Sequence, residues 1–117
     1  KETQYTITLK GIEGSKQIMA IMDKLRNNPP KEFGDKKVLK IRDYKSGKVL
    51  DTVTGAETQT GLPSSNVLYF ELTDGAWCGA RPSGTEPKIK FYMGVKGSSL
   101  EDAQDQVESL TEAVKQL

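Results

Sequence analysis

The stretch WCGARPSGTEPKIKFYMGV, which runs from Trp77 to Val95, decides how this chain folds because it predicts two strands with a short break between them. After the break, apolar and polar residues alternate, and the apolar set consists of Ile89, Phe91, Met93 and Val95. This alternation is typical of an antiparallel strand with one buried face and one wetter face. The break, RPSGTEP, has the composition of an ordinary turn, but also the arginine, hydroxyls and glycine of a loop that holds an anion.

A hairpin is expected immediately before the break, in the sequence NVLYFELTDGAWCGA. The pair Asp74–Gly75 is a strong signal for a two-residue turn. Such a turn predicts that Leu72 lies opposite Trp77 and that Phe70 lies opposite Gly79.

Two helices are expected, one on each side of the strands. The segment EGSKQIMAIMDKLRNNPP predicts the first, with Ser15 as its cap and Asn27–Pro30 as its end. Its apolar stripe consists of Ile18, Ile21, Met22 and Leu25. Ser98 and Glu101 predict a capping box for the second helix. The stripe of that helix consists of Leu100, Ala103, Val107, Leu110, Val114 and Leu117. Because it spans fewer than three heptads, packing on a sheet is favoured over a coiled coil.

The rest of the chain gives weaker signals. Residues 5–11 predict a first strand or a linker, residues 36–44 a short strand, and residues 49–52 a weak one. Residues 53–65 predict an irregular loop that is functional or partly disordered. We therefore expect one domain, residues 1–117, of the α+β class: a mostly antiparallel sheet of about four strands with two helices on one face.

Composition excludes several kinds of chemistry. The sequence contains no histidine, which removes Ser–His–Asp triads and Cys–His zinc sites. The net charge of +1 gives no general attraction to nucleic acids, so an anion site must come from a local cluster. The single cysteine, Cys78, is expected to be a small, semi-apolar strand residue and fits a reducing, cytoplasmic location. No apolar run approaches the roughly 20 residues that cross a bilayer, and no signal peptide is recognised, so we expect no membrane partner. Because the chain begins at Lys1, we expect it to be one domain of a longer protein.

The break between the two strands carries the residues of an anion site. Arg81 offers a forked donor that suits phosphate oxygens. Ser83 and Thr85 offer hydroxyls, and Gly84 between them permits a nest of backbone N–H groups. The following strand adds two basic residues on one face, Lys88 and Lys90. A plain connector remains the competing interpretation, and Glu86 counts against an anion site unless it points away or pairs with a lysine.

The segment GARPSGTEPKIKFY, Gly79 to Tyr92, closely resembles the phosphate-binding loop of the α-D-phosphohexomutases, which include phosphoglucomutases and phosphomannomutases. The resemblance extends to LPSSNVLYFELTDGAW and LKGIEGSKQIMAIMDKLRNNPP, and so covers nearly the whole chain. The part of these enzymes that the chain resembles is their C-terminal, fourth domain. The KIKFY continuation favours the phosphoglucomutase branch. It implies a sheet with helices on one face, often described as TATA-box-binding-protein-like.

The resemblance also implies a function. The family consists of Mg²⁺-dependent enzymes that move a phosphoryl group between C1 and C6 of a hexose phosphate by way of a phosphoserine. In this domain the family's loop binds the phosphate that does not react, which here implies the residues Arg81, Ser83, Gly84, Thr85 and, more weakly, Lys90. The implied partners are the phosphosugar, a glucose or mannose phosphate, and the other three domains of the same chain.

Loops that perform the family's chemistry have no counterpart in this sequence. The Ser-His pair of the phosphoserine loop, the D-G-D-type metal loop and the G-E-E-S-G-type sugar loop are all missing. We therefore expect no catalytic residue and no bound metal here, with the Mg²⁺ ligands outside this domain, and no mutase activity from this chain alone.

Two other functions compete with this one. The wetter sheet face carries Tyr69, Tyr92, Lys88 and Lys90, which suits a module that stacks single-stranded nucleic acid. The near-neutral charge and the lack of an RNP-type sequence argue against nucleic acid as a partner. The other alternative is an interaction domain with a degenerate loop.

Overall fold

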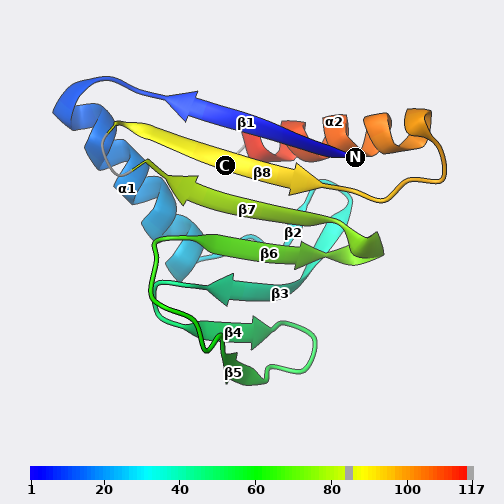
Figure 1. Cartoon of the computed structure of the whole chain (residues 1–117), viewed down its shortest axis with the longest axis horizontal. Coiled ribbons are helices and arrows are strands. Elements are labelled where there is room, and N and C mark those ends of the chain that lie inside the picture. Colours follow the sequence, from blue (N-terminus) through cyan, green and yellow to red (C-terminus); the bar gives the residue numbers. More distant parts are fainter. Residues whose placement is uncertain (84–85, 116–117) are drawn as a thin grey trace.

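The computed structural model describes residues 1–83 and 86–115 (Figure 1). Its elements, in chain order, are β1 (Glu2–Thr8), α1 (Gly11–Asn27), β2 (Glu32–Phe33), β3 (Lys36–Asp43), β4 (Lys48–Asp51), β5 (Glu57–Gln59), β6 (Leu68–Leu72), the short turn η1 (Thr73–Gly75), β7 (Trp77–Pro82), β8 (Lys88–Gly94) and α2 (Leu100–Lys115).

One antiparallel sheet runs through the molecule in the order β1-β8-β7-β6-β3-β4-β5, and β2 pairs with β3 beside this path. The predicted α+β class is confirmed, but the sheet has more strands than the four expected. One of the additional strands, β5, lies in the segment predicted to be irregular. Its three residues are exposed and pair with β4. Ladder hydrogen bonds hold β5 without burial, so it leaves no apolar pattern in the sequence.

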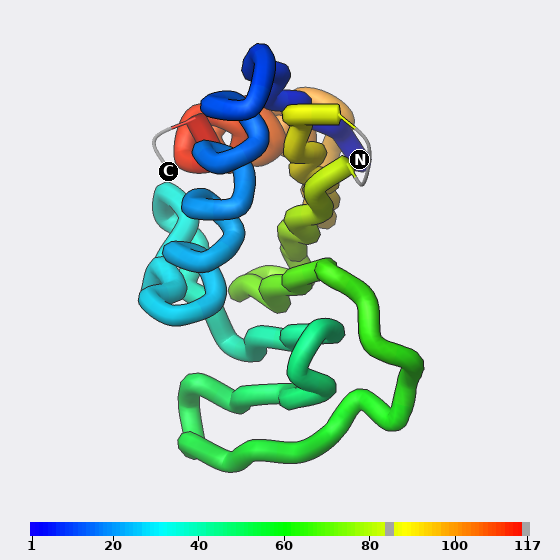
Figure 2. The backbone as a smooth tube through the Cα atoms, turned by 90° about the vertical axis from the view of Figure 1, so that its left-hand side faces the viewer, coloured from blue at the N-terminus to red at the C-terminus, as the bar shows by residue number. Residues whose placement is uncertain are grey.

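Both helices lie on the same side of the sheet (Figure 2). The core between the layers contains the predicted apolar residues Ile89, Phe91, Met93 and Val95, which are at most 5% exposed, and the apolar residues of β6. From the helices it contains Ile18, Met22, Leu25, Ala103, Val107, Leu110 and Val114. The opposite face of β6, β7 and β8 is covered by neither helix and is therefore the open face of the sheet.

Neither helix has its cap at the predicted residue. The helix α1 begins at Gly11 with no side-chain cap, because the Gly14 N–H already donates to Lys10 O at 2.9 Å, before Ser15 is reached. It ends at Asn27, as predicted.

The cap of α2 lies one residue later than predicted. The Asp102 N–H donates to Ser99 Oγ at 3.1 Å, and Asp102 Oδ2 accepts the Ser98 N–H at 2.9 Å. The Ser98 hydrogen bond and a second one from Gln106 lower the pKa of Asp102. Leu100, expected in the apolar stripe, is 86% exposed because it starts the helix, and Leu117 lies outside the described residues.

The turn between β6 and β7 forms at Asp74–Gly75, where the sequence predicts it, but it also includes Thr73. Both residues of Asp74–Gly75 have positive φ angles, 61° and 73°. The Leu72 N–H donates to Ala76 O at 2.9 Å, and Trp77 lies opposite Glu71 instead of Leu72. The predicted register is therefore wrong by one residue, because an irregularity next to the turn shifts the pairing.

The face that each hairpin residue occupies explains this register. Phe70 lies opposite Cys78, and Leu68 lies opposite Ala80, and all four side chains are in the core. The predicted pairing of Phe70 with Gly79 would place the wrong set of β7 residues against the helices, because side chains alternate strictly between faces. Small residues on β7 fit beneath the large residues of β6.

Trp77 covers a glycine on the open face of the sheet. It lies opposite Gly94, and a Cβ atom added to Gly94 would lie 2.2 Å from the indole nitrogen. The indole also stacks on Tyr69, with ring centroids 5.6 Å apart. Gly94 is therefore required at this position, although its strand favours residues with a side chain.

The substitution Gly94→Ala should lower the free energy of unfolding by about 1–3 kcal/mol, because the methyl group overlaps the indole. Gly79→Ala is the matched control on the neighbouring strand, since its Cβ atom would find ordinary contacts at 3.8 Å. Urea unfolding followed by Trp77 fluorescence measures both. Equal stability of the two variants would show that the indole does not lie on Gly94.

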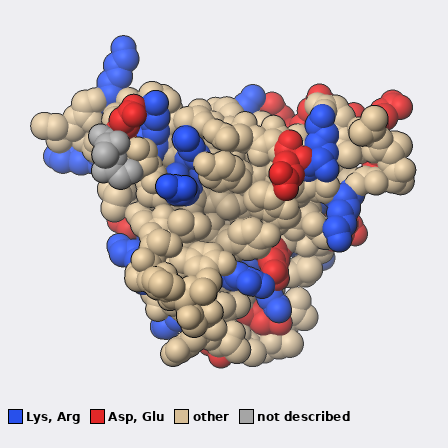
Figure 3. Space-filling model, in the orientation of Figure 1, with Lys and Arg blue, Asp and Glu red and all other residues tan. Residues whose placement is uncertain are grey.

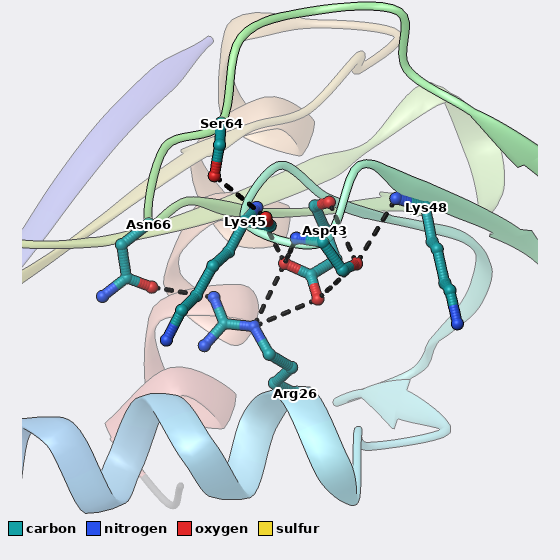
Figure 4. Close-up of polar contacts among 7 residues, drawn as sticks. Arg26, Asp43, Lys45, Lys48, Ser64 and Asn66 are labelled. Atoms are coloured by element: carbon teal, nitrogen blue, oxygen red, sulfur yellow. Dashed lines mark hydrogen bonds and ion pairs between the residues drawn. The ribbon is translucent and has the colours of Figure 1, made fainter.

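Arg26 ties the end of α1 to the sheet (Figure 4). Its Nε donates to both carboxylate oxygens of Asp43 at 3.1 Å, and its Nη2 donates to Asn66 Oδ1 at 2.7 Å. Burial of Asp43 opposes ionisation, but hydrogen bonds from Arg26 and Ser46 and the charge of Arg26 outweigh burial and lower the pKa of Asp43. The cluster holds the segment before β6 against the helix.

The lowered pKa predicts how stability depends on pH. The stabilisation from Asp43 is complete above its ordinary pKa of 3.8 and is lost as the pH falls through its lower folded value. At pH 7, Asp43→Asn should lower the free energy of unfolding by about 1–3 kcal/mol, and the difference from the parent should shrink below about pH 4. Asp105→Asn, at an exposed position, should change it by less than about 0.5 kcal/mol. Denaturant unfolding across this pH range tests the assignment, and a pH-independent difference would contradict it.

Candidate functional site: a basic pocket at the β7–β8 loop

Two basic residues meet at the end of the β7–β8 ladder. Arg81 is the direct cross-strand partner of Lys90, so both side chains lie on the open face. Arg81 is exposed and Lys90 is half-buried. Figure 3 views this face and shows basic side chains gathered at its upper left. No acidic side chain within residues 1–83 or 86–115 forms an ion pair with Arg81 or Lys90, so their positive charge is available to an anion.

These residues enclose a small pocket of about 140 Å³, lined by Arg81, Pro82, Ser83, Lys90 and Tyr92. Three of the five residues predicted to bind phosphate, Arg81, Ser83 and Lys90, are therefore brought together. The remaining two, Gly84 and Thr85, lie outside the described residues. Forked guanidinium, ammonium and hydroxyl groups around one small space are the donors that bind a phosphate group.

The base of the loop is held by backbone hydrogen bonds. The Ser83 N–H donates to Lys88 O at 2.9 Å, and the Leu9 N–H donates to Pro87 O at 2.8 Å. The Glu86 N–H donates to Ser83 Oγ at 3.3 Å, which orients the serine side chain. The loop therefore rests on β8 and on the segment that leads into α1.

Glu86 lies next to this pocket but is paired with a lysine. Its carboxylate pairs with Lys88 at 3.0 Å and does not line the pocket. An anion site required Glu86 to point away or to pair with a lysine, and this pairing is the second of these arrangements. Lys88 is therefore paired within the chain, and the two basic residues that line the pocket are Arg81 and Lys90.

Sequence reasoning missed two features of this region. It did not assign Tyr92 to the pocket, although the alternation of β8 places Tyr92 on the same face as Lys90. It also missed a second cavity of about 350 Å³ on the α1 side of the loop. Its lining consists of Ser15, Ile18, Met19, Asn66, Pro82, Ser83, Glu86 and Pro87. Only tertiary packing brings α1 to the loop, so no sequence signal predicts this cavity.

The open face is less suited to nucleic acid than the sequence alone indicates. Tyr69 is engaged in its stack on Trp77, and the Arg42 guanidinium lies 5.9 Å from the Tyr69 ring. Lys88 is paired with Glu86. Two of the four residues considered for stacking and phosphate contact thus already have partners within the chain.

Neither a nucleophilic thiol nor a metal cluster accompanies the pocket in the described part of the chain. Cys78 is fully buried, and burial raises the pKa of its thiol to about 12. Within residues 1–83 and 86–115, no three His, Cys, Asp or Glu side chains are close enough to hold a metal ion. The described residues therefore offer no site for the Mg²⁺ that the family resemblance implies and whose ligands it puts outside this domain. None of the described helices is long and apolar enough to cross a membrane.

Comparison with known proteins finds similarity to phosphoglucomutases. No family model matches the chain. The similarity is specifically to phosphoglucomutases: the chain is 39% identical over 110 residues to the phosphoglucomutase of Staphylococcus aureus strain bovine RF122 / ET3-1. Identity is 37% to that of strain MRSA252 and 36% to that of strain N315. These alignments cover 94% of the chain but only 20% of each relative, so the chain spans about a fifth of their length. The resemblance predicted from the RPSGTEP segment is confirmed.

Burial of Cys78 predicts slow modification by a disulfide reagent such as dithionitrobenzoate at pH 8. The folded chain should react at least about 100-fold more slowly than the urea-unfolded chain, because both access and the thiolate are suppressed. The release of the coloured thiolate product measures the rate. A native rate close to the unfolded rate would contradict the register that places Cys78 opposite Phe70.

Proposed function

We propose that this chain is the C-terminal domain of a phosphoglucomutase-like enzyme that interconverts hexose 1-phosphate and hexose 6-phosphate. The role of this domain is to bind the phosphate of the sugar that does not react. Arg81 and Lys90 supply positive charge, and Ser83 supplies a hydroxyl. Gly84 and Thr85 complete the loop in this proposal, on the strength of the resemblance alone.

The observation that supports this role best is the convergence of Arg81, Ser83 and Lys90 on one pocket of about 140 Å³. Its volume is below the several hundred Å³ of sites that enclose a whole small-molecule ligand. A phosphate group matches both its size and its charge. Similarity to phosphoglucomutases along 94% of the chain supports the same assignment independently of the pocket.

Binding a remote phosphate contributes to catalysis through orientation. Contacts to a group that does not react fix the position of the group that does, and this converts binding energy into a lower barrier. A hexose bisphosphate intermediate presents a phosphate at either end, so one pocket serves both halves of the reaction. Mg²⁺ would be held by residues outside this domain.

The rest of the catalytic machinery belongs to other domains in this proposal. The sequence has no histidine and none of the phosphoserine, metal or sugar loops of the family. The chain by itself should therefore bind a phosphosugar weakly, on the order of millimolar, and should not catalyse the mutase reaction.

In the full-length enzyme, Arg81→Ala should lower kcat/KM for glucose 1-phosphate by about 10- to 100-fold, since it removes charge-assisted hydrogen bonds to phosphate. Arg42→Ala is the matched control, because Arg42 lies on the same sheet but pairs with Glu71 at 2.8 Å. Steady-state kinetics with a coupled glucose 6-phosphate assay measures both variants. An unchanged kcat/KM in the Arg81 variant would refute the phosphate-binding role.

A further inference from the structure

Tyr92 is the one aromatic residue in the lining of the basic pocket. It lies two residues after Lys90 on β8 and opposite Gly79 of β7, which itself lies two residues before Arg81. The pocket is therefore bordered by the loop on one side and by the phenol ring on the other. Within residues 1–83 and 86–115, no helix or strand covers this ring from the open face, and the ring is half-buried.

The size of the pocket leaves most of a sugar phosphate outside it. A space of about 140 Å³ accepts a phosphate group but not the hexose attached to it. The carbon skeleton of the ester must therefore leave across the rim of the pocket. Pro82 and Tyr92 are the two lining residues with a large apolar surface, and Tyr92 also has a polar hydroxyl at its tip.

Tyr92 differs from its neighbour on the open face. Tyr69 is stacked on Trp77 with an interplanar angle of 14°. Within the described residues, Tyr92 has no ring partner and makes no side-chain hydrogen bond. Its ring is thus available to a ligand, whereas the ring of Tyr69 is already engaged.

We propose that Tyr92 packs against the sugar of a phosphate monoester whose phosphate occupies the basic pocket. This inference rests on the proposed function, and it assigns Tyr92 as the residue that favours a hexose phosphate over inorganic phosphate. The apolar face of the sugar packs on the phenol ring, while Arg81 and Lys90 hold the phosphate. The ring, rather than the hydroxyl, carries the contact.

The test compares two probes, inorganic phosphate and glucose 1-phosphate, by NMR titration of the 117-residue chain, whose helices and sheet enclose a core of their own. The parent should bind glucose 1-phosphate about three- to tenfold more tightly than inorganic phosphate. Tyr92→Ala should abolish this preference and leave the Kd for inorganic phosphate within about twofold. Tyr92→Phe should retain the preference, because it keeps the ring. The matched control Tyr69→Ala, on the same face but outside the pocket, should also retain it.

The outcomes separate this inference from the proposed function. Suppose that inorganic phosphate binds in an Arg81-dependent manner. The role of Tyr92 alone would then be overturned if the parent showed no preference for the sugar phosphate, or if the preference persisted in Tyr92→Ala. Failure of both probes to bind would overturn the phosphate pocket and the role of Tyr92 together. The amide spectrum of each variant shows whether it has folded, and Tyr92→Phe provides a conservative second variant.

Discussion

The pairing of β7 with β8 is the constraint on which the core and the candidate site both depend. Cys78 opposite Met93 and Ala80 opposite Phe91 place four side chains against the helices. Because successive side chains point to opposite faces, the same register puts Arg81 and Lys90 together on the open face. A slip of β8 by one residue would expose Phe91 and turn Lys90 toward the core, away from Arg81. Burial of the apolar residues therefore holds the charged pair in place.

Glycines permit the aromatic cover of the open face. Trp77 occupies the space that any side chain at position 94 would need. Its stack with Tyr69 adds about 1 kcal/mol of stability beyond the contribution of the surface that it buries. Burial is the main influence on Tyr69 and raises the pKa of its hydroxyl, with the charge of Glu71 acting in the same direction. These rings shield the ladder from water on the side that has no helix. Tyr92 lies at the edge of this cover, next to the basic pocket.

Sequence patterns predicted the fold best where burial repeats with a fixed period. The alternation from Ile89 to Val95 and the stripe from Ile18 to Leu25 are both confirmed, since each depends only on which face is buried. Predictions that depend on one hydrogen bond were less accurate. The hairpin register was wrong because of an irregularity beside Asp74–Gly75, and the predicted cap at Ser15 was wrong because helical bonding starts earlier. For the site, the loop and its strand were predictable because Arg81, Ser83 and Lys90 are close in sequence.

The sequence by itself determined the α+β class, the buried faces of the main elements and the basic, hydroxyl-rich loop, because these depend on residue type and on local spacing. Tertiary structure alone decided that Glu86 pairs with Lys88, that Cys78 and not Gly79 faces the core, and that Tyr92 joins the basic pocket. The positions of Cys78 and Tyr92 depend on the register between strands, and the Glu86–Lys88 pair forms where the chain enters β8. Strand register is set by the fit of side chains distant in sequence, which no local pattern records.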